Sequence, residues 1–304
     1  MSTVALAHPV SDAVQQQIDD FRRYLFELGL HPATITSYAT DVRQFHEFLT
    51  GMGEGHSTTP TRPHVIRYRT HLLELRLKVA TVNKKINSLA AYDRYLNQKG
   101  LLTGHVVHPH RDRITVATGS ERKVEAFTDE EITRILFHVQ QPSCSLRNRL
   151  IVEMLLYTGV RVSELCNVQL KDLDLLTHTL RVTGKGGTYR EIPLRPELVE
   201  SIQRYLGGER RNSRFTESPY LLLSQRAAKL HRDAVNRLLK TLGDKLGMSI
   251  YPHKFRHTFC SVLIRRGVAL TTVRKLAGHA SIQTTSQFYV HTNREDMEEA
   301  VTLL

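Results

Sequence analysis

The chemistry of this sequence is most visible in PHKFRHTF, where His253 and Arg256 stand three positions apart. Pro252 suits the first turn of a helix, because its missing N–H has no intrahelical partner there. Residues three apart share one face of a helix, so the imidazole and the guanidinium are expected side by side. Such a pair suits a phosphate, since arginine can bind it through two parallel hydrogen bonds and histidine can transfer a proton.

Four other polar residues stand in sequence contexts that would expose a reactive group. Arg161 follows Gly159 in TGVRVSEL, where the glycine allows a tight turn before the next helix. Lys185 lies in GKGG, at the tip of a predicted hairpin, with no bulky neighbour to keep its ammonium from a ligand. His279 follows a helix-terminating glycine, and Tyr289 offers a phenol ten residues later. Each is ordinary by itself, and only the set suggests a site.

Two alternative chemistries fit these residues less well. His253 and His257 have a spacing of four, which also occurs in zinc sites. However, Lys254 stands where zinc proteases have a glutamate, and no Asp, Glu or Cys accompanies the pair. The glycines around Lys185 are not followed by the GKS or GKT of a phosphate-binding loop. We therefore expect no metal ion, no ATP and no other cofactor.

In its order along the chain, this set resembles the tyrosine recombinase family, also called phage integrases, and most closely its Xer-like members. The resemblance covers nearly the whole chain and rests on TGVRVSEL, GKGGTYREIPL, HKFRHTF, LAGH and FYVHT, which match the family boxes in identity and order. One departure is the spacing from His279 to Tyr289, which is ten residues where Xer-like members usually have nine.

The resemblance implies that the catalytic residues are Arg161, Lys185, His253, Arg256, His279 and Tyr289. Tyr289 would attack a DNA phosphodiester and keep the phosphate as an ester, while the arginines stabilise the charge that grows on its oxygens. Lys185 would protonate the departing 5′ oxygen, and His253 would transfer the phenol proton. His279 would donate a hydrogen bond to the phosphate.

Two further residues would support this set without contacting the reacting atoms. Glu164 would orient the site from behind Arg161, and His257 would pack beneath the site. Because the phosphotyrosyl bond would store the energy of the broken phosphodiester, the reaction needs neither a nucleotide nor a divalent metal ion.

The first hundred residues are predicted to form four amphipathic helices. Apolar residues recur at helical spacing in the ranges 14–28, 35–49, 65–75 and 82–96. The other face of the fourth range is polar, and its width fits a DNA major groove. Its residues are Lys84, Lys85, Asn87, Ser88 and Arg94. An ordinary solvated face is the alternative explanation.

Helical periodicity is lost between residues 100 and 122, a stretch rich in Gly, His, Pro and Thr that is typical of a linker. Beyond it we expect helices at 128–139, 146–157, 162–168, 197–206, 232–246, 254–266, 271–278, 282–289 and 295–303, with a β-hairpin at 179–183 and 188–192. The predicted fold class is mainly α with a small antiparallel β-sheet. The resemblance makes 11–99 a core-binding (SAM-like) DNA-binding domain, and 123–304 a catalytic domain ending in an exchange helix.

The composition of the chain indicates which partners and which cellular compartment to expect. The chain has 304 residues, 40% of them hydrophobic, and a formal net charge of +12. Two domains with sizeable cores are expected, and the basic excess favours a polyanionic partner. No apolar run approaches the roughly 20 residues needed to cross a bilayer, and the N-terminus lacks a secretory signal. The three cysteines are too scattered for a disulfide framework or a metal site. We expect a cytoplasmic protein with no membrane partner.

The segment after Tyr289 predicts a protein partner. Apolar residues at helical spacing lie outside every catalytic motif, and they are Met297, Ala300, Val301 and Leu304. In the family this segment docks into a neighbouring protomer. The resemblance therefore implies a homo-tetramer on two double-stranded DNA sites, or an assembly with a paralogous recombinase, and it leaves an accessory protein open. The alternative is a helix that folds back on its own domain.

We interpret the chain as a site-specific recombinase that cuts and rejoins DNA through a covalent 3′-phosphotyrosyl intermediate and a Holliday junction, acting in resolution, integration or excision. One alternative is a type IB topoisomerase, but the Xer-like N-terminal half and the apolar tail argue against it. Another is a non-catalytic DNA-binding architectural protein. That class is expected to have lost a catalytic residue, and none is missing here.

Overall fold

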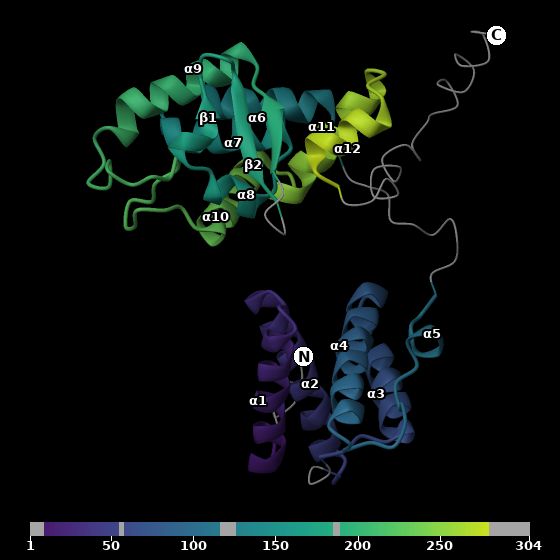
Figure 1. The fold of residues 1–304 in the computed structure, drawn as a ribbon. Coiled ribbons are helices and arrows are strands. Elements are labelled where there is room, and N and C mark those ends of the chain that lie inside the picture. The colour runs from purple at the N-terminus through teal and green to yellow at the C-terminus, as the bar shows by residue number, and fades with distance from the viewer. Residues whose placement is uncertain (1–8, 55–57, 116–125, 185–188, 280–304) are drawn as a thin grey trace, which may run out of the picture. The chain divides into compact units, whose positions relative to one another are not determined.

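The structure, a computed structural model, describes residues 9–54, 58–115, 126–184 and 189–279 of the chain (Figure 1). The chain divides into two compact units, residues 1–121 and 122–304. Each unit has its own core of buried apolar side chains. The elements are mostly helices with one three-stranded antiparallel sheet, so the predicted fold class is confirmed.

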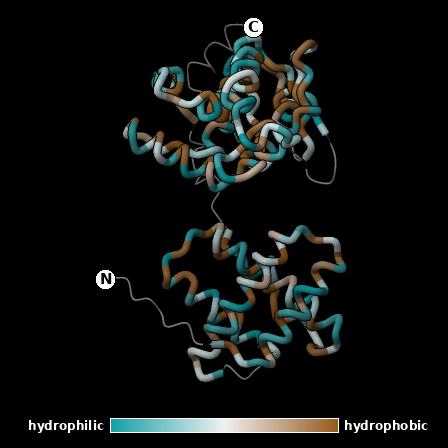
Figure 2. Tube along the Cα trace, turned by 90° about the vertical axis from the view of Figure 1, so that its left-hand side faces the viewer, coloured by the Kyte–Doolittle hydropathy of each residue, from teal (hydrophilic) through white to brown (hydrophobic). Residues whose placement is uncertain are grey.

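The first unit contains the four helices that the apolar periodicity predicts. They are α1 (Asp12–Glu27), α2 (Pro32–Gly51), α3 (Arg62–Glu74) and α4 (Val79–Gln98). The start of α1 is capped by Ser11, whose hydroxyl accepts from the backbone N–H of Val14 at 3.4 Å. Helices α2 and α3 have proline in their first turn. Helix α4 packs against the other three, and apolar and polar stretches alternate along the helices (Figure 2).

The stretch expected to be a linker lies, over its described part, against this helical unit. Asp112 of the short helix α5 (Pro109–Asp112) is 2% exposed and accepts two hydrogen bonds of 2.6 Å from Arg62 of α3. Asn83 of α4 exchanges hydrogen bonds with the backbone N–H and carbonyl of Ile114, at 2.8 and 3.0 Å. Side chains of the helices thus provide hydrogen-bond partners for the backbone of this stretch. Residues 101–115 therefore pack with the first unit although they have no helical periodicity.

The second unit combines a small sheet with helices, and one face of the sheet is exposed. The helices of its described part are α6 (Asp129–Gln140), α7 (Leu146–Thr158), α8 (Val162–Asn167), α9 (Pro196–Tyr205), α10 (Arg232–Leu246), α11 (Pro252–Arg265) and α12 (Leu270–Ala277). The helices expected at 282–289 and 295–303 lie outside the described residues. Helix α7 is buried on nearly every side and packs on α6, α9 and α11, so it forms the centre of this core. Its neighbours carry the polar residues of the predicted site.

The sheet has the order β1-β2-β3, with β1 (Leu173–Asp174), β2 (Thr179–Thr183) and β3 (Tyr189–Pro193). In the β2–β3 pair, Thr179 lies opposite Pro193 and Thr183 opposite Tyr189, which confirms the predicted hairpin. The sequence did not predict β1, because two residues are too few to show alternation. Within the described residues, no helix is long and apolar enough to span a bilayer.

Candidate active site

Arg256 is the most deeply buried cation of the site. The residue is 2% exposed on α11, and its Nη1 donates to the carbonyl oxygen of Gly159 at 2.7 Å. Its Nη2 is also buried and has no hydrogen-bond acceptor within the described part of the chain. Burial, followed by repulsion from Arg161, lowers the pKa of Arg256 to about 10, so the side chain remains charged at neutral pH. A buried cation thus keeps a donor available for an anionic ligand.

A second arginine, Arg161, is placed by the turn between α7 and α8. It is the N-cap residue of α8, and its backbone N–H donates to Oε2 of Glu164 at 2.7 Å. Its Nη1 donates to Oε1 of Glu164 at 2.8 Å and its Nη2 to the carbonyl of Gly278 at 3.0 Å. The Arg161 side chain is 42% exposed, so its guanidinium is held on two sides and still reaches solvent.

Glu164 is the charged centre beneath Arg161. Burial alone would raise the pKa of Glu164, but hydrogen bonds from Arg190 and from the backbone of Arg161 outweigh it and hold that pKa below its usual range. Arg190 of β3 donates to both carboxylate oxygens, at 3.1 and 2.9 Å. Sequence analysis did not identify Arg190. The only available signal was a basic residue inside a β-prone run, which also fits an exposed strand position.

Three histidines lie close to the two arginines. His253 and His257 stack edge to face on α11, with ring centroids 4.5 Å apart. Burial is the main cause that lowers the pKa of all three, to about 4 for His257 and His279. Arg256 lowers each of these pKa values further. The histidines are therefore neutral at neutral pH, and a neutral imidazole can accept a proton as well as donate a hydrogen bond.

A hollow of about 350 Å³ opens beside these groups. It is lined by Arg161, His253 and Arg256, together with Ser163 of α8, Asn236 of α10 and Tyr251 just before α11. Sequence analysis named none of these last three. Asn236 could not have been found, because α10 carries no motif and only folding brings it to this site. The two arginines that line this hollow suit an anion. Among the described residues, no group of three or more His, Cys, Asp or Glu side chains could hold a metal ion.

The structure brings together most of the residues that were predicted to form or support the catalytic site. Arg161, Glu164, His253, Arg256, His257 and His279 all belong to one cluster. Lys185 and Tyr289 lie outside the described residues. So do the four tail residues Met297, Ala300, Val301 and Leu304.

The polar face of α4 is narrower than the sequence indicated. Lys85 is 8% exposed and its ammonium donates to Oδ1 of Asp41 at 3.2 Å, while Ser88 is 0% exposed and donates to Oδ2 of Asp41 at 2.7 Å. Asp41 itself is 2% exposed on α2. A buried carboxylate needs such partners, so these two side chains face α2 rather than solvent. Lys84 and Arg94 are exposed, and Asn87 is half-buried.

The two units also match known families. Residues 125–296 match the model of the phage integrase family, and residues 18–100 match that of its N-terminal SAM-like domain. The chain belongs to the phage integrase family and is a Xer-like, site-specific tyrosine recombinase.

Relatives of this recombinase extend over nearly its whole length. The tyrosine recombinase XerC of Oceanobacillus iheyensis is 31% identical and the alignment covers 93% of each chain. The tyrosine recombinase XerA of Pyrococcus furiosus is 32% identical over 93% of this chain and 92% of that protein. The XerH recombinase, solved with a palindromic difH substrate after cleavage, is 19% identical and has a TM-score of 0.77 over 98% of this chain and 99% of its own. The two proteins therefore share a fold.

Proposed function

We propose that this recombinase cleaves and rejoins double-stranded DNA through a covalent 3′-phosphotyrosyl intermediate. The observation that carries the proposal is Nη2 of Arg256, a buried cationic donor without an acceptor in the described part of the chain. Burying a charge is costly unless it is paired. A DNA phosphate in the adjacent hollow would supply both the missing acceptor and the opposite charge.

The proposed chemistry exchanges one phosphate ester for another. The phenol oxygen of Tyr289 attacks the scissile phosphorus, and the bond from phosphorus to the 5′ oxygen breaks. The phenol proton passes to His253, which is neutral at the start, and Lys185 protonates the departing 5′ oxygen. Arg161 and Arg256 bind the non-bridging oxygens as their charge grows. Attack by a free 5′ hydroxyl reverses these steps and rejoins the strand.

His279 and Glu164 complete the proposed site. His279 donates a hydrogen bond to a non-bridging oxygen. Glu164 accepts from Arg161 and fixes the direction of its guanidinium. The phosphotyrosyl ester conserves the energy of the phosphodiester, so the proposal needs neither ATP nor a metal ion.

The DNA partner is supported by the surface of α4 as well as by the site. Lys84 and Arg94 are exposed there, although the ammonium of Lys84 also donates to Oδ1 of Asp41 at 3.1 Å. Oδ1 of the half-buried Asn87 accepts from Nε of Arg113 at 2.8 Å. Cations on such a face neutralise backbone phosphates, and a polar helix face of this kind fits a major groove. The XerH structure was solved with its difH substrate, which further supports a duplex as the partner.

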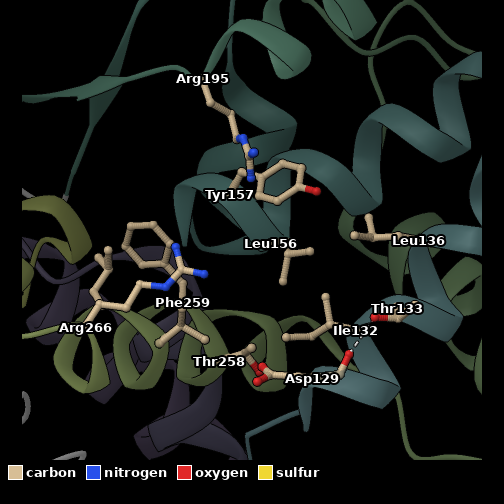
Figure 3. Close-up of a pocket in the computed structure, with 12 residues that line it drawn as sticks. Asp129, Ile132, Thr133, Leu136, Leu156, Tyr157, Arg195, Thr258, Phe259 and Arg266 are labelled. Carbon is tan, nitrogen blue, oxygen red and sulfur yellow. Dashed lines mark hydrogen bonds between the residues drawn. The ribbon is translucent and has the colours of Figure 1, made fainter.

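A second hollow supports assembly into a tetramer. Apolar side chains of α6, α7 and α11 surround a hollow of about 380 Å³, which is also lined by two basic residues, Arg195 and Arg266, and one acidic residue, Asp129 (Figure 3). The tail sequence REDMEEAVTLL combines four acidic residues with the stripe that ends at Leu304. Apolar and charge complementarity both favour docking of this tail into the hollow of a neighbouring protomer. Four such contacts would close a ring on two DNA sites.

The proposed nucleophile can be tested directly. A binding site is first selected from a pool of randomised duplexes, and a nick is placed near the scissile position so that cleavage becomes irreversible. The wild-type protein should form an adduct that survives denaturing electrophoresis, in excess EDTA and without ATP. Tyr289→Phe should form none while binding the duplex with nearly unchanged affinity. An adduct formed by Tyr289→Phe, or a strict requirement for added Mg²⁺, would contradict the proposal.

A further inference from the structure

Arg190 occupies an unusual position for a residue on a short strand. It lies on β3 opposite Val182 of β2, and its side chain is only 13% exposed. All three nitrogens of its guanidinium are engaged: Nη1 and Nη2 donate to the two oxygens of Glu164, at 3.1 and 2.9 Å, and Nε donates to the carbonyl of Leu276 at 2.7 Å. One side chain thus connects β3, α8 and the last turn of α12.

The end of α12 is built around this side chain. Gly278 ends the helix with φ of +68°, and a Cβ there would lie 2.7 Å from Nη1 of Arg190. The carbonyl of Gly278 accepts from Nη2 of Arg161 at 3.0 Å. His279 is the next residue in the chain. The guanidinium of Arg190 therefore packs directly against the turn that delivers His279.

These contacts form a closed ring of hydrogen bonds. It runs from Arg161 to Glu164, from Glu164 to Arg190, from Arg190 to the end of α12, and from Gly278 back to Arg161. Arg161 and Arg190 together surround the carboxylate of Glu164, which accepts four bonds from them. Removing Arg190 would leave Glu164 with one partner and release the end of α12 from β3.

We propose that Arg190 is a positioning residue for strand cleavage, which fixes Glu164 and the turn after α12 and thereby holds Arg161 and His279 in their catalytic positions. The inference rests on the proposed function, in which both of those residues contact the scissile phosphate. A misplacement of about 1 Å at a reacting centre can lower a rate about 100-fold, so a side chain that never contacts DNA can control the rate.

The geometry also indicates which substitution can replace Arg190. Its role uses a planar fork for the carboxylate and a third donor, Nε, directed to a backbone carbonyl. Lysine keeps the charge but offers a single ammonium on a flexible stem. If only the charge neutralised Glu164, Arg190→Lys would be nearly as active as the wild-type protein. If the fork positions two elements, Arg190→Lys should lose most of the activity.

The test measures single-turnover cleavage of the nicked duplex at saturating protein, with duplex affinity and thermal stability measured in parallel. The variants are Arg190→Gln, Arg190→Lys, Glu164→Gln and the double variant Arg190→Gln/Glu164→Gln. The matched control is Arg204→Gln on α9, which removes an exposed arginine that pairs with Glu200. Its cleavage rate should equal that of the wild-type protein.

We expect Arg190→Gln to cleave about 100-fold more slowly than the wild-type protein, with affinity for the duplex changed less than threefold. Arg190→Lys should lose at least ten-fold. The double variant should be no slower than the slower single variant, because residues that act through one another are not additive. The inference would be overturned if the rate losses of the two single variants multiply in the double variant. It would also be overturned if Arg190→Gln is defective only in binding or folding, or if Arg190→Lys is fully active. Failure of the wild-type protein and of Arg204→Gln to form any adduct would refute the proposed function instead.

Discussion

Nη1 of Arg256 donates to the carbonyl oxygen of Gly159 across 2.7 Å, so the turn that ends α7 holds the arginine of α11. The same turn places Arg161 two residues later at the start of α8. A single glycine in the left-handed region, with φ of +60°, therefore determines where both arginines stand. This relationship explains why the two motifs TGVRVSEL and HKFRHTF, almost a hundred residues apart in the sequence, form one site.

Gly159→Ala should destabilise the protein more than an ordinary glycine substitution at a helix end. An alanine there would adopt a strained φ, which costs about 1–2 kcal/mol, and its Cβ would lie 2.4 Å from the ring of Phe259. Overpacking adds about 1–3 kcal/mol. Gly247→Ala is the control, because Gly247 has φ of +65° with nothing within 4 Å. Equal losses of unfolding free energy in urea titrations of the two variants would show that the ring contact does not matter.

The sequence predicted those elements whose signals are local. The apolar stripes of the first unit and Pro252 at the start of α11 place these helices to within a few residues. The arginines and histidines of the site were also predicted, because their types and order are distinctive. Arg190 was not, since its role depends on which helix end packs against β3, and no local pattern encodes that contact.

On α4 the sequence predicted too much rather than too little, because two residues assigned to its polar face are buried. Lys85 and Ser88 have the residue types of a solvated face, yet both are directed to Asp41 of α2. A buried aspartate on another helix draws polar partners inward, and periodicity on one helix cannot show this. Periodicity also could not show that residues 101–115 pack on the first unit, because side chains of two helices, Arg62 and Asn83, bind their backbone.

The stability of the free protein should fall as the pH decreases from about 6.5. In the folded chain the pKa of His257 and of His279 is about 4, lowered first by burial, whereas the ordinary value is 6.5. Below pH 6.5 the unfolded chain binds protons that the folded chain does not, so the stability is fully present above pH 6.5 and decreases as the pH falls toward 4.

His279→Gln should reduce this dependence between pH 6.5 and 5, because the difference in bound protons shrinks by up to one. Urea midpoints at pH 7.5, 6 and 5 measure the effect, with His110→Gln, which removes an exposed histidine of α5, as the control. An unchanged pH dependence in His279→Gln would show that this histidine is protonated equally in both states.

Removal of residues 294–304 should abolish synapsis and leave single occupancy of a half-site. Met297, Val301 and Leu304 would each contribute about 1.5–3 kcal/mol when fully buried, so the loss of the stripe is enough to prevent assembly. Arg266→Glu should weaken assembly in the same direction, because it reverses a charge in the hollow that the acidic tail is proposed to enter. Arg204→Glu on α9 is the control, because Arg204 does not line the hollow. Sizing of DNA complexes distinguishes the states, and normal tetramers from the truncated chain would refute tail docking.

The exposed and the buried residues of α4 should respond differently to truncation. Arg94→Ala removes an exposed cation, so it should weaken duplex binding at low salt and reduce the slope of log affinity against log salt by about one. Ser88→Ala instead removes a buried donor from Asp41, which should lower the unfolding free energy by about 1–3 kcal/mol. It should leave the affinity and salt slope of the folded protein unchanged. Fluorescence anisotropy across a salt series, paired with urea unfolding, separates the two effects. If the salt slope falls in Ser88→Ala, or does not fall in Arg94→Ala, DNA contacts another face of this unit.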